Sequence, residues 1–293
     1  MKVLSFGEIL FDIIEGEPYL GGAPLNFAAH LAQLGVQSYI FSAVGKDALG
    51  SEALRQIEDL GVNTEFVQVK DEYSTGTVPV VFQNGQPDYT IVRDVAYDYI
   101  ALNGNAKAVA KAGFDVLYYG TLAQRNEESR NTLKQLLENN SFKQVFYDIN
   151  LRKDCFNKEL IHESLQHCSM LKLNDEEVEV LSGMFFDKSL ELQDFCARMA
   201  LEYNLEVIVV TAGAKGCYIL EGLELYFVNG YPAKVVDTVG AGDSFSAAFV
   251  YHYLKKGDAL VAADIANRLG AFVASSRGPL PAYTPEIRRV LEL

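Results

Sequence analysis

The sequence contains few cysteines and histidines, and none of them has the spacing of a metal site. Its four cysteines, Cys155, Cys168, Cys196 and Cys217, stand far apart without a CxxC pair, and its four histidines include no HExxH pattern. A zinc site therefore has little support. Separated thiols of this kind are typical of buried, reduced cysteines, so we expect a cytoplasmic protein.

Concentrated positive charge and long apolar runs are also missing. The formal net charge is −14, from 25 Lys and Arg against 39 Asp and Glu, and no basic cluster suggests a nucleic-acid-binding face. The N-terminal MKVLSFGEILFD has only a short apolar run broken by acids, which predicts a core strand rather than a signal peptide. No segment approaches the apolar length of a membrane span. We expect neither nucleic acid nor membrane as a partner.

Short β-rich runs alternate with helical patterns along most of the chain. Residues 3–6, 38–45, 114–120, 143–150, 169–173 and 207–213 read as strands, and helical patterns cover 24–35, 51–61, 129–139 and 175–183. Several of the strands are continuously apolar, as expected where both faces of a sheet are buried. The alternation predicts an α/β fold, with a mostly parallel central sheet between helices, in a single domain over residues 1–293.

One segment breaks this alternation. From about residue 62 to 98 there is no convincing helix, and TVPVVFQNGQPDYTIVRD reads as a hairpin around Asn84 and Gly85. We expect a small β lid formed by about residues 11–20 and 62–98, although an edge hairpin or a dimer contact fits the pattern equally well. In the C-terminal third, residues 217–236 read as antiparallel strands and two helices follow, roughly 243–256 and 258–276.

The stretch DTVGAGDSF (237–245) carries the most chemistry. Phe245 stands where a dinucleotide-binding GxGxxG motif needs its third glycine, and the chain has no GxxxxGK[ST] loop. Instead, the backbone N–H groups of Ala241, Gly242 and Asp243 could hold a phosphoryl group at a helix start. The Asp243 carboxylate could then accept the proton of the attacking hydroxyl, since phosphoryl transfer needs positioning more than a strong base. A tight turn with a capping acid is the alternative.

A second glycine turn lies near the N-terminus. Gly21 and Gly22 precede a helical pattern that contains Asn26, and Asp12 is expected in the loop after the first strand. Paired glycines allow a ligand close to the backbone, Asn26 can donate and accept, and Asp12 could accept two hydrogen bonds from a diol. Each signal is weak alone, because glycine turns before helices are common.

Together these segments resemble ribokinase-like sugar kinases of the phosphofructokinase-B type. GGAPLNFAAHLAQLG (21–35), GKDALG (45–50), DINLR (148–152), NDEE (174–177), TAGAKG (211–216) and DTVGAGDSF (237–245) occur in the family's order, essentially end to end. DTVGAGDSF is the most specific of these motifs. GGAP…N with DINLR is most similar to the fructokinase branch, and 2-keto-3-deoxygluconate kinases come second. The resemblance implies a ribokinase-like three-layer αβα sandwich with a small β lid.

The resemblance also implies a role for each matching residue. Asp243 would be the catalytic base, with Gly240, Ala241 and Gly242 as the anion hole. The residues that would hold the sugar are Asp12, Gly21, Gly22 and Asn26. Thr211, Gly213 and Gly216 would line the ATP phosphates and ribose, and Asn267 the adenine. Asp237 and the Val239 carbonyl match a monovalent-cation site, usually filled by K⁺, with Val273, Ser276, Gly278 and Ala282 where its remaining ligands stand.

Asn174 and Glu177 allow two interpretations. They match the NxxE motif that organises water around Mg²⁺ in this family. The same spacing is a helix capping box, with Asn174 as N-cap and Glu177 at the third helical position. The two roles are compatible, because Mg²⁺ keeps several of its waters.

Two arginines are the cations that we place near the ligand. Arg152 lies in DINLR just after a strand, and Arg93 lies on the expected lid. Either could pair with a phosphate or an anionic sugar. A solvated hairpin charge is the alternative for Arg93. Tyr89 could form an aromatic wall for the sugar or simply pack within the hairpin.

The resulting prediction is an ATP-dependent sugar kinase that uses Mg²⁺ and K⁺, with fructose as first substrate. 2-Keto-3-deoxygluconate, other ketoses or aldoses, and nucleosides are the rival substrates. A sugar-binding regulator without catalysis is the alternative from another class, disfavoured because the GAGD, NxxE, DxNxR and TAGAKG motifs are all intact. An exposed β appendage suits a homodimer.

Overall fold

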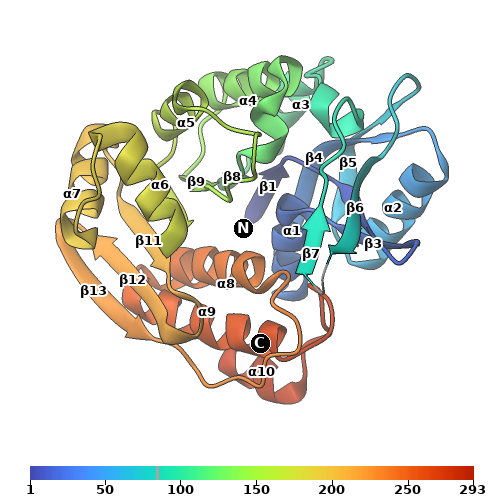
Figure 1. Cartoon of the computed structure of the whole chain (residues 1–293). Coiled ribbons are helices and arrows are strands. Elements are labelled where there is room, and N and C mark those ends of the chain that lie inside the picture. The colour runs from blue at the N-terminus through green and yellow to red at the C-terminus, as the bar shows by residue number, and fades with distance from the viewer. Residues whose placement is uncertain (84–85) are drawn as a thin grey trace. The chain divides into compact units, whose positions relative to one another are not determined.

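The computed structural model describes residues 1–83 and 86–293. Contacts between residues divide the chain into two compact units. The first comprises Met1–Ala32 and Val36–Phe142, and the second comprises Gln33–Gly35 and Lys143–Leu293. Each unit contains parallel strands and helices, and a second small sheet completes an α/β fold (Figure 1). The predicted fold class is thereby confirmed.

The first unit is built on four strands in the order β8-β1-β4-β5, all parallel. These strands are β1 (Lys2–Phe6), β4 (Gln37–Gly45), β5 (Asn63–Lys70) and β8 (Val116–Tyr119). Its helices are α1 (Ala23–Gln33), α2 (Ala48–Asp59), α3 (Asn105–Ala112) and α4 (Glu127–Asn139), with short 3₁₀ turns η1 (Ala96–Tyr99) and η2 (Leu122–Arg125). All four residues of β8 are buried, which explains why it reads as continuously apolar.

The second small sheet lies within the first unit. It has the order β3-β2-β6-β7, from β2 (Leu10–Ile14), β3 (Glu17–Gly21), β6 (Gly76–Gln83) and β7 (Gln86–Tyr89). β6 and β7 are antiparallel as the hairpin prediction required, while the turn predicted at Asn84 and Gly85 lies outside the described residues. Residues 63–70, which the prediction assigned to the lid, instead form β5 and pair with β4.

The second unit has five strands in the order β13-β12-β11-β10-β9. β9 (Gln144–Asp148), β10 (Met170–Asn174) and β11 (Val207–Thr211) are parallel, and β12 (Gly216–Glu221) and β13 (Glu224–Asn229) add the predicted antiparallel pairing. The helices are α5 (Lys158–Leu165), α6 (Asp175–Phe186), α7 (Leu192–Tyr203), α8 (Ala241–Lys256), α9 (Ala259–Ala274) and α10 (Pro285–Val290), with the 3₁₀ turn η3 (Gly213–Lys215).

Helices α8 and α9 pack side by side, orange and red in Figure 1. α8 is buried from Ser244 through Val250, so a full two turns of the helix are covered on every side. Such a helix is fixed by the core, and its N-terminal turn is held in place with it. The predicted helix starts at 243 and 258 are close to the observed starts at Ala241 and Ala259.

The four cysteines are buried thiols, as predicted. Among the described residues, no helix combines the length and the apolar character that crossing a membrane requires.

Candidate active site

The N-terminus of α8 is built around Gly240. Gly240 is the N-cap, its φ of 77° lies in the left-handed region, and no side chain caps the helix there. A Cβ at this position would lie 2.4 Å from the Pro279 Cβ, so the turn requires glycine on two counts. Helix starts expose backbone N–H groups and positive potential, which suits an anion. The uncapped turn therefore fits a phosphoryl group.

The first turn of α8 carries the predicted base. Gly242 is exposed and Asp243 is half-buried. The Ala241 N–H donates to the Thr238 carbonyl at 3.3 Å, a long hydrogen bond that closes the turn. Of the three N–H groups predicted to cradle the phosphoryl group, that of Ala241 therefore has an internal acceptor in this structure.

The Asp237 carboxylate joins two loops that the cation prediction placed together. Its Oδ1 accepts the Val239 N–H at 3.0 Å and its Oδ2 accepts the Gly278 N–H at 3.2 Å. The backbone N–H groups of Val236 and Asp237 both donate to the Ala274 carbonyl. The loop before α8 and the loop after α9 are thus adjacent, so the carboxylate and the carbonyls of these two loops are candidate oxygen ligands for a cation.

Ser276 and Val273 belong to the same region but have internal hydrogen bonds. The Ser276 Oγ donates to the Phe272 carbonyl, and the Ser276 N–H donates to the Val273 carbonyl. Within residues 1–83 and 86–293, no group of three or more His, Cys, Asp or Glu side chains could hold a metal ion. A cation here would thus depend mainly on backbone oxygens.

Asn174 and Glu177 form the capping box at the start of α6. The Asn174 Oδ1 accepts the Glu177 N–H, and the Glu177 Oε2 accepts the Asn174 N–H, both at 2.8 Å. The Glu177 Oε1 also accepts the Leu151 N–H at 2.7 Å, which ties the DINLR loop to α6. Burial raises the pKa of Glu177. Each carboxylate oxygen keeps a second lone pair, so the residue still fits Mg²⁺ reached through water.

Arg152 is half-buried in the DINLR loop. Within the described part of the chain, no carboxylate forms an ion pair with its guanidinium. An arginine at this position, in an acidic chain, suits an anionic group of a ligand.

Sequence reasoning missed a buried ion pair in this unit. The Lys172 Nζ on β10 lies 2.9 Å from both carboxylate oxygens of Asp148, at the end of β9. The Asp148 Oδ2 is also 3.0 Å from the Ser246 Oγ on α8. A lone lysine within the apolar run SMLKL was the available signal, because a buried lysine needs a partner.

The predicted ATP loop is a tight turn between β11 and β12. The Ala212 N–H donates to the Gly216 carbonyl, and Gly213 and Gly216 have φ values of 55° and 124°. A Cβ on Gly216 would lie 2.1 Å from the Val228 carbonyl oxygen, so only glycine fits. Thr211 is half-buried at the end of β11.

Asn267 on α9 is buried and points to β13. Its Nδ2 donates to the carbonyls of Val228 and Asn229 at 3.3 and 3.2 Å. The side chain therefore has a structural contact beside the adenine role that the resemblance implies.

The predicted sugar-binding residues gather at the start of α1 in the first unit. Asp12 lies in strand β2 rather than in a loop, and a Cβ on Gly21 would lie 3.1 Å from its Oδ2. Gly22 has a φ of 117° and no room for a side chain, because a Cβ would lie 2.4 Å from the Glu8 carbonyl oxygen. Asn26 is buried on the first turn of α1. Backbone glycines, a carboxylate and an amide thus meet at one helix start.

Glu8 is a second residue that sequence reasoning missed. Its side chain is buried, and its Oε1 accepts the Ala23 N–H at 3.2 Å. The carboxylate thereby occupies the N-terminus of α1, where negative charge is stabilised. The available signal was in FGEILFD, where Glu8 interrupts an apolar run just after the first strand.

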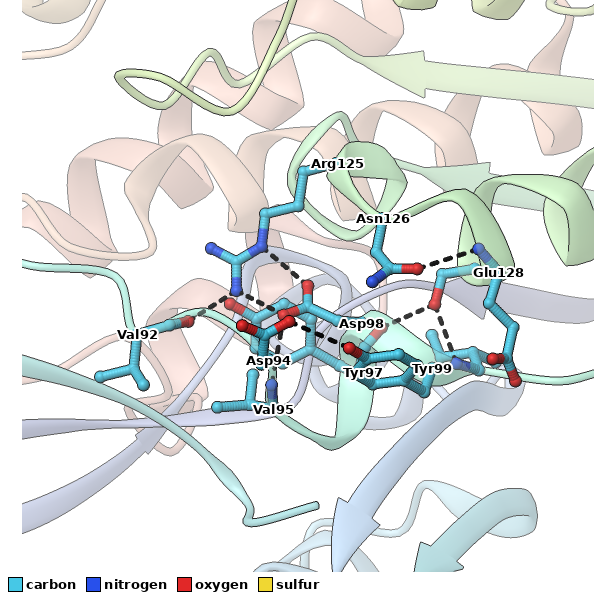
Figure 2. Close-up of polar contacts among 11 residues, drawn as sticks. Val92, Asp94, Val95, Tyr97, Asp98, Tyr99, Arg125, Asn126 and Glu128 are labelled. Carbon is cyan, nitrogen blue, oxygen red and sulfur yellow. Dashed lines mark hydrogen bonds and ion pairs between the residues drawn. The ribbon is translucent and has the colours of Figure 1, made fainter. Parts of the chain in front are cut away.

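Tyr89 and Arg93 are both exposed, and the segment between them is held from within the first unit. The Thr90 and Val92 N–H groups donate to the Pro79 and Thr77 carbonyls. Figure 2 shows Arg125 on η2 reaching the Val92 carbonyl at 2.6 Å and both oxygens of Asp98 at 2.7 and 2.8 Å. The loop that carries Arg93 is therefore fixed by a buried ion pair.

The predicted residues thus form two groups. Asp12, Gly21, Gly22 and Asn26 lie together in the first unit, with Tyr89 and Arg93 on its second sheet and the following loop. Arg152, Asn174, Glu177, Thr211–Gly216, the 237–243 loop, Asn267 and residues 273–278 all lie in the second unit.

The chain is similar to known sugar kinases over nearly its whole length. The chain is 28% identical to the uncharacterized sugar kinase PH1459 of Pyrococcus horikoshii, over 94% of this chain and 91% of that protein. It is 27% identical to a fructokinase of Escherichia coli, over 96% of this chain and 95% of that one. The structure of PH1459 in complex with ATP matches with a TM-score of 0.83 and 26% identity, covering 98% of this chain and 99% of that chain.

The fold has a further match among solved structures. A protein of E. coli described as a ribokinase II, in its apo form, superposes with a TM-score of 0.87 at 24% identity, over 99% of both chains. This likeness confirms the ribokinase-like fold. The model of the pfkB family of carbohydrate kinases matches residues 4–286. The chain therefore belongs to the pfkB carbohydrate kinase family, and it is an ATP-dependent kinase.

Proposed function

We propose that this kinase phosphorylates a hydroxyl of a free sugar, with fructose as the substrate and Asp243 as the base. The observation that carries the proposal is the start of α8, where an uncapped glycine turn and a half-buried carboxylate share one helical turn. The fructokinase of E. coli among the relatives supports the choice of sugar, as does GGAP…N with DINLR.

The sugar would be held by the group at the start of α1. Asp12 can accept hydrogen bonds from two hydroxyls, Asn26 can donate and accept, and the glycines leave room for a ring at the backbone. Arg93 and Tyr89 would complete the sugar-binding site, and the second small sheet would act as its lid. A closing lid would exclude water and limit ATP hydrolysis.

The nucleotide would be held by the second unit. Thr211, Gly213 and Gly216 would approach its phosphates and ribose, and Asn267 its adenine. Glu177 and Asn174 would hold Mg²⁺ through water, and Asp237 with the Val239, Val273, Ser276 and Gly278 carbonyls would hold K⁺. When bound, these cations supply positive charge to the phosphates and their loop.

Side chains and backbone groups of the second unit would each have a separate role in phosphoryl transfer. Asp243 accepts the hydroxyl proton as the oxygen attacks, and the N–H groups at Gly240–Gly242 hold the transferred group's oxygens. Arg152 offers a further positive charge. Because the transition state is loose, alignment and charge stabilisation carry most of the acceleration.

The first test is ADP release from ATP and Mg²⁺ across a sugar panel, with and without K⁺. We expect fructose to give the highest turnover and Asp243→Asn to lower kcat at least ~100-fold, since a positioned base contributes about 10²–10⁴-fold. Glu127→Gln, an exposed acid in the first turn of α4, is the matched control and should leave kcat unchanged. An Asp243→Asn enzyme of wild-type activity would remove the base assignment.

2-Keto-3-deoxygluconate is the second candidate. Arg93 and Arg152 favour it, because an anionic substrate calls for cations around the sugar. The same panel separates the two sugars by kcat/KM. A chain that binds a sugar without turnover would instead be a regulator. A cytoplasmic location and a homodimer stay predictions from the sequence.

A further inference from the structure

We propose that Lys172 is a positioning residue whose buried ammonium group lies behind the anion hole at Gly242 and strengthens phosphate binding there. This inference rests on the proposed role of the 240–243 turn. It concerns a residue that touches neither the sugar nor the proton in transfer.

The geometry places the Lys172 charge directly behind the turn. A Cβ on Gly242 would meet the Lys172 Nζ at 3.7 Å, and no other heavy atom outside its own helix turn is closer. Gly242 itself is exposed, whereas Lys172 is only 7% exposed. The ammonium group therefore approaches the phosphate-binding backbone from the protein interior, where water does not screen it.

A buried carboxylate accompanies this lysine. The Lys172 Nζ lies 2.9 Å from both oxygens of Asp148, and the side chains of both residues are buried, so the two groups form an ion pair. A positive charge next to uncapped N–H groups adds to the potential of the helix start.

The same lysine also fixes the helix. It holds both oxygens of Asp148, and Asp148 in turn contacts the Ser246 Oγ one turn beyond Gly242. The Ser246 Oγ is also 3.0 Å from the Gly242 carbonyl oxygen. β9, β10 and the first two turns of α8 are therefore linked through one ion pair, which sets the position of Gly242 and Asp243.

The competing explanation is that Lys172 only neutralises Asp148. Removing the lysine alone would not separate the two explanations, because the buried Asp148 carboxylate would be left unpaired and the fold would weaken. The isosteric double variant Asp148→Asn with Lys172→Met removes both charges and keeps the volumes. It is compared with Asp148→Asn alone, which keeps the lysine.

Two readouts are measured for these proteins: steady-state kinetics with the best sugar, and binding of ATP and of adenosine by calorimetry. We expect the double variant to have a kcat about 100-fold below that of Asp148→Asn, in line with the loss of one anion-hole group, while the KM for sugar stays within about threefold. ATP affinity should fall at least ~10-fold and adenosine affinity should not change, because adenosine has no phosphate. Lys188→Met, an exposed lysine of the same unit, is the matched control.

The outcomes separate this inference from the proposed function. If the double variant matches Asp148→Asn in both kcat and ATP affinity, Lys172 is only a counterion and the inference is overturned. If no sugar supports turnover in the wild type, the sugar-kinase proposal fails, and the comparison of ATP affinities still decides the role of Lys172. A Tm that is higher for the double variant than for Lys172→Met alone would show that the ion pair between Lys172 and Asp148 also stabilises the fold.

Discussion

At the scale of single residues, His252 is the most unusual buried group outside the site. It lies on α8 with no exposed surface, and neither ring nitrogen has a hydrogen-bond partner within the described residues. Burial lowers its pKa to about 4, with Lys256 and Lys255 adding to this effect and Glu292 opposing it. The ring is therefore neutral in the folded protein at physiological pH.

This histidine should make the protein less stable in mild acid. Its folded pKa is below the value near 6.5 of the unfolded chain, so the unfolded chain binds the proton first as the pH falls from about 6.5 towards 4. Between pH 6.5 and 5.0 we expect the wild type to lose up to about 2 kcal/mol of unfolding free energy relative to His252→Leu.

Urea denaturation of both proteins at several pH values measures this difference. Subtracting the two curves removes the contribution of the carboxylates that titrate in the same range. His162→Gln, which alters an exposed histidine, is the control and should show the wild-type slope. A constant difference between wild type and His252→Leu over this range would contradict the prediction.

At the scale of elements, the ion pair between η1 and η2 orders the segment that follows β7. Arg125 and Asp98 are 4% and 2% exposed, and Arg125 also lies 5.1 Å from the Tyr97 ring centroid. The Tyr99 hydroxyl donates to the Asp94 Oδ1 at 2.9 Å (Figure 2). The Tyr99 ring also stacks on the ring of Tyr73. Two short turns thus hold a loop that has no regular structure of its own.

Breaking this buried ion pair should lower the free energy of unfolding far more than breaking an exposed ion pair. Arg125→Met leaves the Asp98 carboxylate buried and unpaired, so we expect the free energy of unfolding to fall by about 3–5 kcal/mol. Arg55→Met removes the exposed pairs of Arg55 with Glu52 and Asp59 and should cost less than about 1 kcal/mol. Urea denaturation of the two variants checks the contrast, and similar losses in both would refute it.

At the scale of the whole molecule, the two units divide the predicted ligands between them. The residues predicted for the sugar lie in Met1–Ala32 and Val36–Phe142, and those predicted for the nucleotide lie in Lys143–Leu293. A ligand that binds one unit should first stabilise the backbone of that unit.

Hydrogen exchange read by mass spectrometry tests this division. We expect a non-hydrolysable ATP analogue to slow exchange in residues 211–216 and 237–243, and fructose alone to slow it in residues 10–26. Glucose at the same concentration is the control for a non-specific sugar effect. Protection by fructose that is confined to Lys143–Leu293 would reverse the assignment.

The sequence by itself determined the local parts of this protein. Continuous apolar runs identified the buried strands, and glycines at 240 and 216 stand where the backbone needs a positive φ or leaves no space for a Cβ. The capping box of Asn174 and Glu177 could be read directly, because it joins residues three apart. The order of the motifs sufficed to predict the fold and the kinase family.

Only the tertiary structure decided contacts between distant segments. It placed residues 63–70 in β5 beside β4 instead of in the lid, and it put Asp12 in a strand. It also joined Lys172 to Asp148 and Ser246, and Arg125 to Asp98. Strand pairing and buried ion pairs depend on which distant segments of the chain pack together in the core. A single sequence shows periodicity and local spacing, but it does not show which distant segments are in contact.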